Sequence, residues 1–212
     1  MTWDHLAADC EDYQRRNADQ HEPDVDPLQG TIDRIHQYSP IRDVLEIGAG
    51  NGWRLRRMAA RYGCTVDGID LSESAAQASR GVVRSGKAPD SLQAIADQAH
   101  DLVILGFFAY LLPRTHLLRL AAETDRILQP GGHVAIIDFL HPYPIRRPYG
   151  HDRRLQVYKH DLSALFTGLP EYVLIDRHLA NHHAHRTDNR DPDRWITVDA
   201  IRKLDTTQAY GG

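Results

Sequence analysis

The stretch VLEIGAGNG, residues 44–52, constrains the fold of this 212-residue chain more than any other. Apolar residues on both sides of Glu46 predict a short buried strand, and three glycines at alternate positions follow directly. A helical pattern then begins at Trp53. Strand, glycine loop and helix is the arrangement by which an open α/β sheet offers backbone N–H groups to a ligand. Glycine lets a ligand approach the backbone closely, and it adopts the positive φ that such a loop requires.

Two acidic residues narrow the kind of ligand. Glu46 lies inside the predicted strand, where a carboxylate is costly to bury unless it accepts specific hydrogen bonds. Asp70 ends the next apolar run, 65–70, at a spacing that fits one βαβ unit. That spacing places Asp70 at the carboxyl end of the neighbouring strand, beside the loop. A carboxylate there can accept hydrogen bonds from both ribose hydroxyls, so we expect a nucleoside-containing ligand.

The remaining periodic segments predict an α/β fold. It is a single Rossmann-like, doubly wound and mostly parallel sheet with an antiparallel C-terminal hairpin. We expect one domain over 1–212, with residues 1–38 as an N-terminal helical cover. Residues 141–160 are rich in Pro, Tyr, His and Arg without a period, which predicts a long substrate loop. Expected helices cover 27–38, 53–62, 73–80, 114–128 and 161–167; expected strands cover 65–70, 81–84, 100–106, 133–139, 171–180 and 194–204.

Composition excludes several classes of partner. The net charge of −4 gives no basic surface for nucleic acid. No stretch approaches the roughly 18 apolar residues of a membrane span, and the acidic N-terminus does not resemble a signal peptide. Two cysteines far apart, Cys10 and Cys64, fit reduced thiols in a cytoplasmic protein. We therefore expect a cytoplasmic protein with a small-molecule substrate, no nucleic acid and no membrane; a homodimer is left open.

The order of elements, with residues 44–52 at its head, resembles the class I S-adenosylmethionine-dependent methyltransferases. Three more stretches match: 68–72 after the second strand, 100–104 at the fourth, and 126–132 before the fifth. The resemblance covers about residues 40–140. Four blocks together are specific, whereas the glycine loop alone is a weak signal. A dinucleotide fingerprint is the alternative, but it would require glycine where Trp53 stands.

The resemblance implies S-adenosyl-L-methionine as cofactor. Glu46 and the glycine loop would face the methionine part of the cofactor. Asp70 would hold its ribose, and Leu71 would lie against its adenine. The chain departs from the family after the third strand, where an acid usually meets the adenine amino group; Ser85, Gly86 and Lys87 stand there, and Asp90 is a weak substitute. The implied cofactor-binding residues are Glu46, Gly48, Ala49, Gly50, Gly52, Asp70, Leu71, Gly106 and Phe107.

Methyl transfer from a sulfonium depends mainly on alignment of the acceptor, with a base where the acceptor must lose a proton. Histidine suits that role, and seven histidines lie between 141 and 185. Because the substrate should sit over the carboxyl ends of the strands, the candidate catalytic residues are His141, His151 and His160. Tyr143, Tyr149 and Arg147 are the candidate substrate-binding residues. The surrounding basic residues of 146–159 favour an anionic acceptor.

A metal site is the less favoured interpretation of the histidine tract. His182 and His183 are neighbours, so in a strand they point to opposite faces. A catechol-type magnesium site would require acids at the ends of the fourth and fifth strands, where only Asp138 is available. We predict that no metal is required. The favoured function is methylation of a small polar, anionic or sugar-like metabolite at oxygen; the alternatives are a protein or RNA methyltransferase, or an inactive cofactor-binding subunit.

Overall fold

Seven strands form one sheet in the order β3-β2-β1-β4-β5-β9-β8 in the computed structural model, which describes residues 3–17, 23, 25–182 and 191–206. Strands β3, β2, β1, β4 and β5 are parallel, and β9 and β8 are antiparallel to their neighbours. This confirms the predicted fold class. The strands are β1 (Asp43–Ile47), β2 (Thr65–Asp70), β3 (Val83–Ser85), β4 (His100–Gly106), β5 (Leu128–Phe139), β8 (Tyr172–Asn181) and β9 (Trp195–Lys203).

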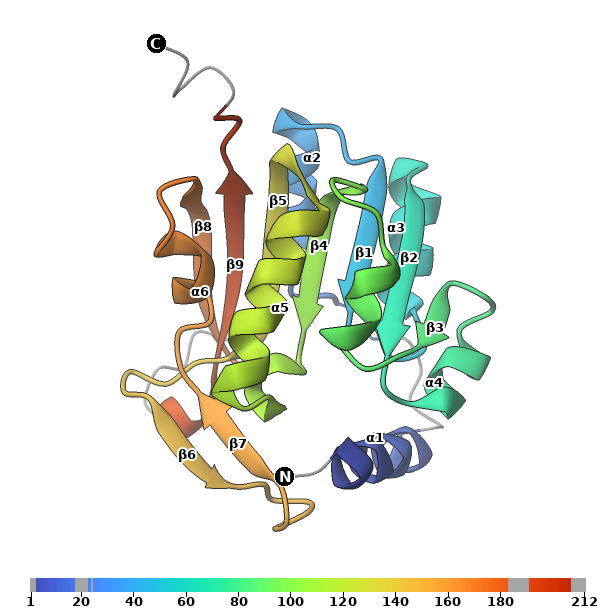
Figure 1. Cartoon of the computed structure of the whole chain (residues 1–212), viewed down its shortest axis with the longest axis vertical. Helices are drawn as coiled ribbons and strands as arrows, with labels where there is room; N and C mark the ends of the chain where they lie inside the picture. The colour runs from blue at the N-terminus through green and yellow to red at the C-terminus, as the bar shows by residue number, and fades with distance from the viewer. Residues whose placement is uncertain (1–2, 18–22, 24, 183–190, 207–212) are drawn as a thin grey trace.

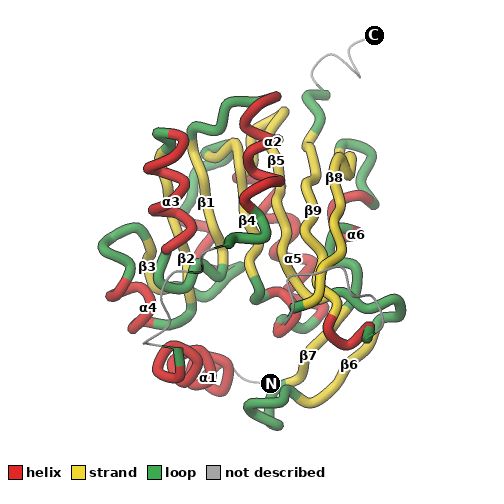
Figure 2. The backbone as a smooth tube through the Cα atoms, turned by 180° about the vertical axis from the view of Figure 1, so that it is seen from behind, coloured by secondary structure: helices red, strands yellow, loops and turns green. Residues whose placement is uncertain are grey.

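Helices cover both faces of this sheet (Figures 1 and 2). Because successive strand residues point to opposite faces, Leu45 belongs to the core on the α5 side and Val44 to the core on the α2 and α3 side. The helices and 3-10 turns of these layers are α2 (Gln29–Tyr38), α3 (Trp53–Tyr62), α4 (Glu73–Ala78), η1 (Asp90–Ala94), η2 (Ala109–Leu111), α5 (Arg114–Ile127), α6 (Ala164–Thr167) and η3 (Pro192–Arg194).

Two further elements lie beyond the carboxyl ends of the parallel strands, at the lower end of Figure 1. One is α1 (Trp3–Arg16), the first part of the expected helical cover. The other is a hairpin of β6 (Ile145–Pro148) and β7 (Gln156–Lys159). The prediction of a long loop over 141–160 is wrong for these eight strand residues, whereas the substrate role of the segment stays a prediction. The strands are only four residues long and β6 buries no side chain, so the hairpin leaves no hydrophobic period in the sequence.

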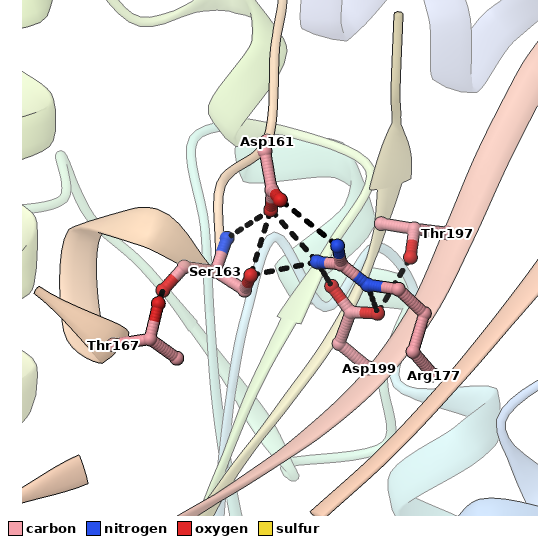
Figure 3. Close-up of polar contacts among 6 residues, drawn as sticks. All are labelled: Asp161, Ser163, Thr167, Arg177, Thr197 and Asp199. Atoms are coloured by element: carbon pink, nitrogen blue, oxygen red, sulfur yellow. Dashed lines mark hydrogen bonds and ion pairs between the residues drawn. The ribbon is translucent and has the colours of Figure 1, made fainter. Parts of the chain in front are cut away.

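An ionic cluster fixes the C-terminal hairpin (Figure 3). The guanidinium of Arg177 on β8 donates to both oxygens of Asp199 on β9, at 2.8 Å each. It also donates to both oxygens of Asp161, ahead of α6, at 2.8 and 2.9 Å. The cluster therefore ties the last two strands to the segment that enters α6.

The described helices include none that is both long and apolar enough to cross a membrane. One strand boundary differs from expectation: β5 begins at Leu128, because residues before His133 already pair with β4.

Candidate functional site

The glycine loop after β1 is held against its neighbours by its own backbone. The amides of Gly48 and Ala49 donate to the carbonyl of Ile69 at 2.8 and 3.1 Å. Gly48, Gly50 and Gly52 have φ values of 77°, 53° and 72°, which L side chains rarely adopt. A Cβ at Gly48 would also lie 2.9 Å from the carbonyl oxygen of Gly106. The loop is thus close-packed between β2 and β4.

Asp70 lies beside this loop at the carboxyl end of β2, as the spacing predicts. Its Oδ2 accepts from the amide of Gly50 at 2.7 Å, and its Oδ1 accepts from the amide of Ser72 at 2.9 Å. Burial raises the pKa of the carboxyl, although these two hydrogen bonds favour its charged form. Each oxygen keeps a further lone pair, so the side chain can accept additional hydrogen bonds from a ligand.

Glu46 is buried on β1 and shares Arg54 with Asp26. The Arg54 guanidinium contacts Oε1 of Glu46 and donates to Oδ2 of Asp26 at 2.7 Å. Arg54 begins a helix that also carries Arg56, Arg57 and Arg61, a pattern typical of a solvated face. The structure shows otherwise for Arg54, which is only 7% exposed. Oε2 of Glu46 is buried and has no hydrogen-bond partner among the described residues. Burial raises the pKa of Glu46 to about 7, despite the attraction of Arg54.

A cavity of about 60 Å³ lies beside Gly48 and Asp70 at the carboxyl edge of the sheet. Its wall on the sheet side includes Gly48, Asp70, Leu71, Gly86, Ala88 and Phe108. Three of the predicted cofactor residues therefore line this cavity together: Gly48, Asp70 and Leu71. Asp90 does not line this cavity: it forms an ion pair with Arg119 at 2.6 Å, so it does not substitute for the acid that the family places near adenine.

The opposite wall of the cavity is α1, which contributes Trp3, Leu6 and Cys10. Glu11 fastens this helix to the start of α4, where its carboxylate accepts from the amide of Glu73 at 2.6 Å and the hydroxyl of Ser74 at 2.5 Å. The sequence predicted a helical cover but none of these wall residues. The signal that pointed to a helix face is the spacing of Trp3, Leu6 and Cys10, three and four positions apart.

The segment after β4 is shaped by a carboxylate at the end of β5. Oδ2 of Asp138 accepts from the amides of Ala109 and Tyr110 at 3.0 and 3.3 Å. Asp138 is fully buried, and burial raises its pKa to about 7. Phe107 has a φ of 50°, a conformation that costs about 1–3 kcal/mol in a non-glycine residue. The sequence named Asp138 only as a metal ligand and missed this positioning role.

Phe107 turns towards the β5 side of the site. Its ring centroid lies 5.7 Å from that of Phe139 and 5.4 Å from that of His182. Phe108, the next residue, lines the cavity instead. Of the two predicted residues at the end of β4, Gly106 lies against the glycine loop. Phe107 packs against the rings of Phe139 and His182.

The three candidate histidines occupy different places. Nδ1 of His141, just beyond β5, is 2.7 Å from the carbonyl of Tyr143, and its Nε2 is 3.7 Å from Oδ1 of Asp193. His151 lies at the tip of the hairpin, with its ring 5.2 Å from that of Tyr149. His160 follows β7 and is half-buried. The structure does not gather the three histidines around one point.

Two basic residues of the hairpin segment, Arg147 and Arg154, have acidic partners. Arg147 forms an ion pair with Asp193 at 2.6 Å, and Arg154 with Asp152 at 2.7 Å. Lys159 differs, because its Nζ lies 4.6 Å from the ring centroid of Phe139 and donates to the carbonyl of Asp193. Burial lowers the pKa of Lys159. Lys159 is thus the hairpin cation that faces the carboxyl end of β5.

A second, larger cavity of about 450 Å³ lies at the opposite edge of the sheet. Asp43, Asp67 and His100 line it, at the amino-terminal half of their strands. Ligands of open α/β sheets bind at the carboxyl ends, so the smaller cavity by the glycine loop is the candidate site.

Within the described ranges no group of three or more His, Cys, Asp or Glu side chains is placed to hold a metal ion. His182 packs against the ring of Phe139 at 4.9 Å, whereas His183 and His185 lie outside the described residues. Independence from metal stays a prediction.

Comparison with known proteins agrees with this geometry. Residues 44–132 match a family model described as a methyltransferase domain. The match covers less than half of the chain, and the fold of the chain is that of solved S-adenosylmethionine-dependent methyltransferases.

Among curated proteins, the chain is 30% identical over 132 residues to a sarcosine/dimethylglycine N-methyltransferase from Halorhodospira halochloris, covering 57% of this chain and 47% of that protein. It is 34% identical over 123 residues to a 27-O-demethylrifamycin SV methyltransferase from Amycolatopsis mediterranei, covering 51% and 43%. The chain thus spans about half the length of these relatives.

A solved structure of the 1,6-didemethyltoxoflavin-N1-methyltransferase from Burkholderia thailandensis, with its substrate and S-adenosylhomocysteine, superposes with a TM-score of 0.68 at 15% identity. The match covers 96% of this chain and 87% of that one.

Proposed function

We propose that this protein transfers a methyl group from S-adenosyl-L-methionine to a small polar metabolite. The observation that carries the proposal is the pairing of two carboxylates around the glycine loop. Asp70 borders the cavity, and buried Glu46 has one oxygen without a hydrogen-bond partner in the described part of the chain. An unsatisfied buried carboxylate oxygen is costly, and the ammonium of a bound amino acid moiety would satisfy it.

The residues present fit this cofactor. Asp70 would accept hydrogen bonds from the ribose hydroxyls, while Leu71 and Ala88 would pack against the adenine. Glu46 and the loop amides would hold the methionine part. The bound cofactor supplies an electrophilic methyl group. The chain would align the acceptor, and α1, which forms one wall of the cavity, would exclude water. Alignment accounts for much of the rate of such a displacement.

The acceptor would sit over the carboxyl ends of β4 and β5, and oxygen is the atom we propose for methylation. The two relatives compared above are named for small-molecule substrates, which supports an acceptor of this size. A hydroxyl acceptor has a proton to lose, so a base is useful. The proposed acceptor-side residues are His141, Tyr143, Arg147, Tyr149, His151 and His160.

Calorimetric titration with S-adenosylhomocysteine tests the cofactor assignment. We expect binding to the wild type and an affinity about 10- to 100-fold lower for Asp70→Asn, because hydrogen bonds to a charged group contribute about 1.5–3 kcal/mol. Asp67→Asn is the matched control, since Asp67 lies three residues earlier on β2 and is exposed. Its affinity should equal that of the wild type.

Turnover is the second measurement. Incubation with labelled S-adenosylmethionine and fractionated metabolite pools should give a labelled small molecule. Binding without transfer to any pool would contradict the proposal and favour a cofactor-binding subunit; label appearing only in protein or RNA would contradict the small-molecule assignment.

A further inference from the structure

The larger of the two cavities, about 450 Å³ at the amino-terminal edge of the sheet, has no part in the proposed function. It lies beside the crossover from β3 to β4, which contains the five-residue turn η1 in place of a longer helix. Charged side chains on the strands beneath, Asp67 on β2 and Arg84 on β3, are exposed and line the cavity. This part of the sheet surface is therefore open to a ligand.

The pairing register places the charged residues of this cavity on one face of the sheet. Partners in parallel strands point to the same face. Asp67 pairs with Leu45, and Leu45 belongs to the core on the α5 side. Arg84 pairs with Ile69, which belongs to the same core. Asp43 lies two positions before Leu45 on β1, so it points the same way. Two carboxylates and a guanidinium thus line the cavity from the α5 side of three adjacent strands.

A histidine adds a buried polar group to this cavity. His100 is 6% exposed and lines the cavity. Leu102, two residues later on β4, belongs to the core on the other face, so in a regular strand His100 would point there too. The register of β4 on β5 shifts between these two residues, and such irregularities redirect side chains, often beside functional sites. Nδ1 of His100 is buried and has no hydrogen-bond partner in the described part of the chain.

The charged side chains of the cavity are unpaired as well. Within the described ranges, those of Asp43, Asp67 and Arg84 form no hydrogen bond and no ion pair. Opposite charges that line one cavity without touching leave room for a ligand that carries both signs. Burial lowers the pKa of His100, so its imidazole is neutral at pH 7 and one ring nitrogen can accept a hydrogen bond. The wall also includes apolar Ile95.

We propose that this cavity binds a small zwitterion with an aliphatic side chain, that is, an amino acid of the leucine type. Its ammonium would lie between the carboxylates of Asp43 and Asp67 and donate to His100. Its carboxylate would pair with Arg84, because a guanidinium can hold both oxygens of a carboxylate. Its side chain would pack against Ile95 and so leave water. The inference is independent of the proposed function, since the cavity lies at the edge of the sheet away from the glycine loop.

Three compounds separate the parts of this recognition. They are L-leucine, 4-methylpentanoate, which is leucine without its amine, and 3-methylbutylamine, which is leucine without its carboxylate. Each is titrated into ¹⁵N-labelled protein saturated with S-adenosylhomocysteine, so that the methionine part of the cofactor site is occupied. Amide shifts report where each compound binds and how tightly. We expect L-leucine to shift the amides of Asp67, Arg84 and His100, and the two fragments to bind at least about tenfold more weakly.

Two substitutions at exposed positions assign the two ends of the ligand. Arg84→Gln should weaken L-leucine about tenfold and leave 3-methylbutylamine unchanged, because only the carboxylate meets the guanidinium. Asp67→Asn should weaken L-leucine and 3-methylbutylamine but not 4-methylpentanoate. Arg114→Gln, at an exposed position of α5 that does not line the cavity, is the control for a lost charge and should change none of these affinities.

Asp70→Asn completes the comparison on β2. It should weaken S-adenosylhomocysteine and leave L-leucine unchanged, whereas Asp67→Asn, three residues earlier, should do the reverse. Such a result would show that the two cavities bind different ligands.

The competing explanation is a polar surface that only meets water. Absence of amide shifts at this cavity, or equal affinities for the three compounds, would favour that explanation and overturn the inference, while the cofactor assignment would stand. A wild type that does not bind S-adenosylhomocysteine would overturn the proposed function alone, since the titrations with L-leucine and its two fragments can be repeated without the cofactor product and still decide this inference.

Discussion

Two arginines in this protein, buried Arg54 and half-buried Arg177, are each shared by two carboxylates. Arg54 is shared by Glu46 and Asp26 beneath the glycine loop, and Arg177 is shared by Asp161 and Asp199 in the C-terminal hairpin. Each cluster has one cation and two carboxylates. Their hydrogen bonds, however, are completed to different extents.

In the Arg177 cluster every carboxylate oxygen has a partner. Besides the arginine, the hydroxyl of Thr197 donates to Asp199 at 2.6 Å, and the hydroxyl of Ser163 donates to Asp161 at 2.7 Å. In spite of burial, these contacts lower the pKa of Asp161.

In the Arg54 cluster one oxygen, Oε2 of Glu46, is left without a partner within the described residues, and burial raises the pKa of that carboxyl to about 7. A cluster whose hydrogen bonds are all made needs nothing further, whereas a buried oxygen without a partner calls for an explanation, and the proposed function supplies one in the cofactor's ammonium.

The largest expected effect concerns Arg177→Met. This change leaves Asp199, which is fully buried, without its cation. Removing one partner of a buried pair costs about 3–5 kcal/mol, and partial exposure of Arg177 places the expected loss in free energy of unfolding near 3 kcal/mol. Urea denaturation measures it. Arg119→Met is the control, because its pair with Asp90 is half-exposed on both sides.

Affinity for S-adenosylhomocysteine should be unchanged in folded Arg177→Met. A loss of affinity comparable to that of a Glu46 variant would remove the distinction between the two clusters.

The features that could be predicted from the sequence are those that depend on residues close together in the chain. The glycine loop and Asp70 were predictable because alternate glycines and a strand-terminal acid follow from one βαβ unit. The role of Arg54 was not, because its partner Asp26 lies 28 residues away. On a helical wheel, an arginine that is buried in an ion pair cannot be told from one that is solvated.

The acceptor side of the site was harder to predict for a related reason. The β6–β7 hairpin buries only one of its strand side chains, so no hydrophobic period marks it. Asp9 sits in a polar helix with few apolar residues, where an acid looks solvent-exposed. Asp9 is nevertheless only 5% exposed, which the helical pattern alone does not reveal.

A smaller effect is expected for Glu46→Gln. The variant keeps the shape of the side chain but removes the charge that would attract the cofactor's ammonium. We expect about tenfold weaker binding of S-adenosylhomocysteine at pH 8. Stability at that pH should not fall, because Arg54 and Asp26 then form a neutral pair and no uncompensated charge stays buried. An unchanged affinity would mean that the free oxygen of Glu46 does not contact the ligand.

The smallest expected effect is the release of a fraction of a proton when the cofactor binds. In the free protein the pKa of Glu46 is about 7, so near pH 7 the carboxyl is partly protonated. A cofactor ammonium beside it favours the charged form and lowers that pKa, so binding releases protons. Affinity should therefore rise with pH up to about 7 and level off above it.

Titration of S-adenosylhomocysteine at pH 7, in buffers of different ionisation enthalpy, counts the released protons. Glu46→Gln should release fewer, and its affinity should vary less between pH 5.5 and 8. Asp138, whose pKa burial also raises to about 7, is present in both proteins, so the difference between them isolates Glu46. Equal proton release by the two proteins would show that Glu46 keeps its proton on binding, and the cluster under the glycine loop would then be structural, like the one around Arg177.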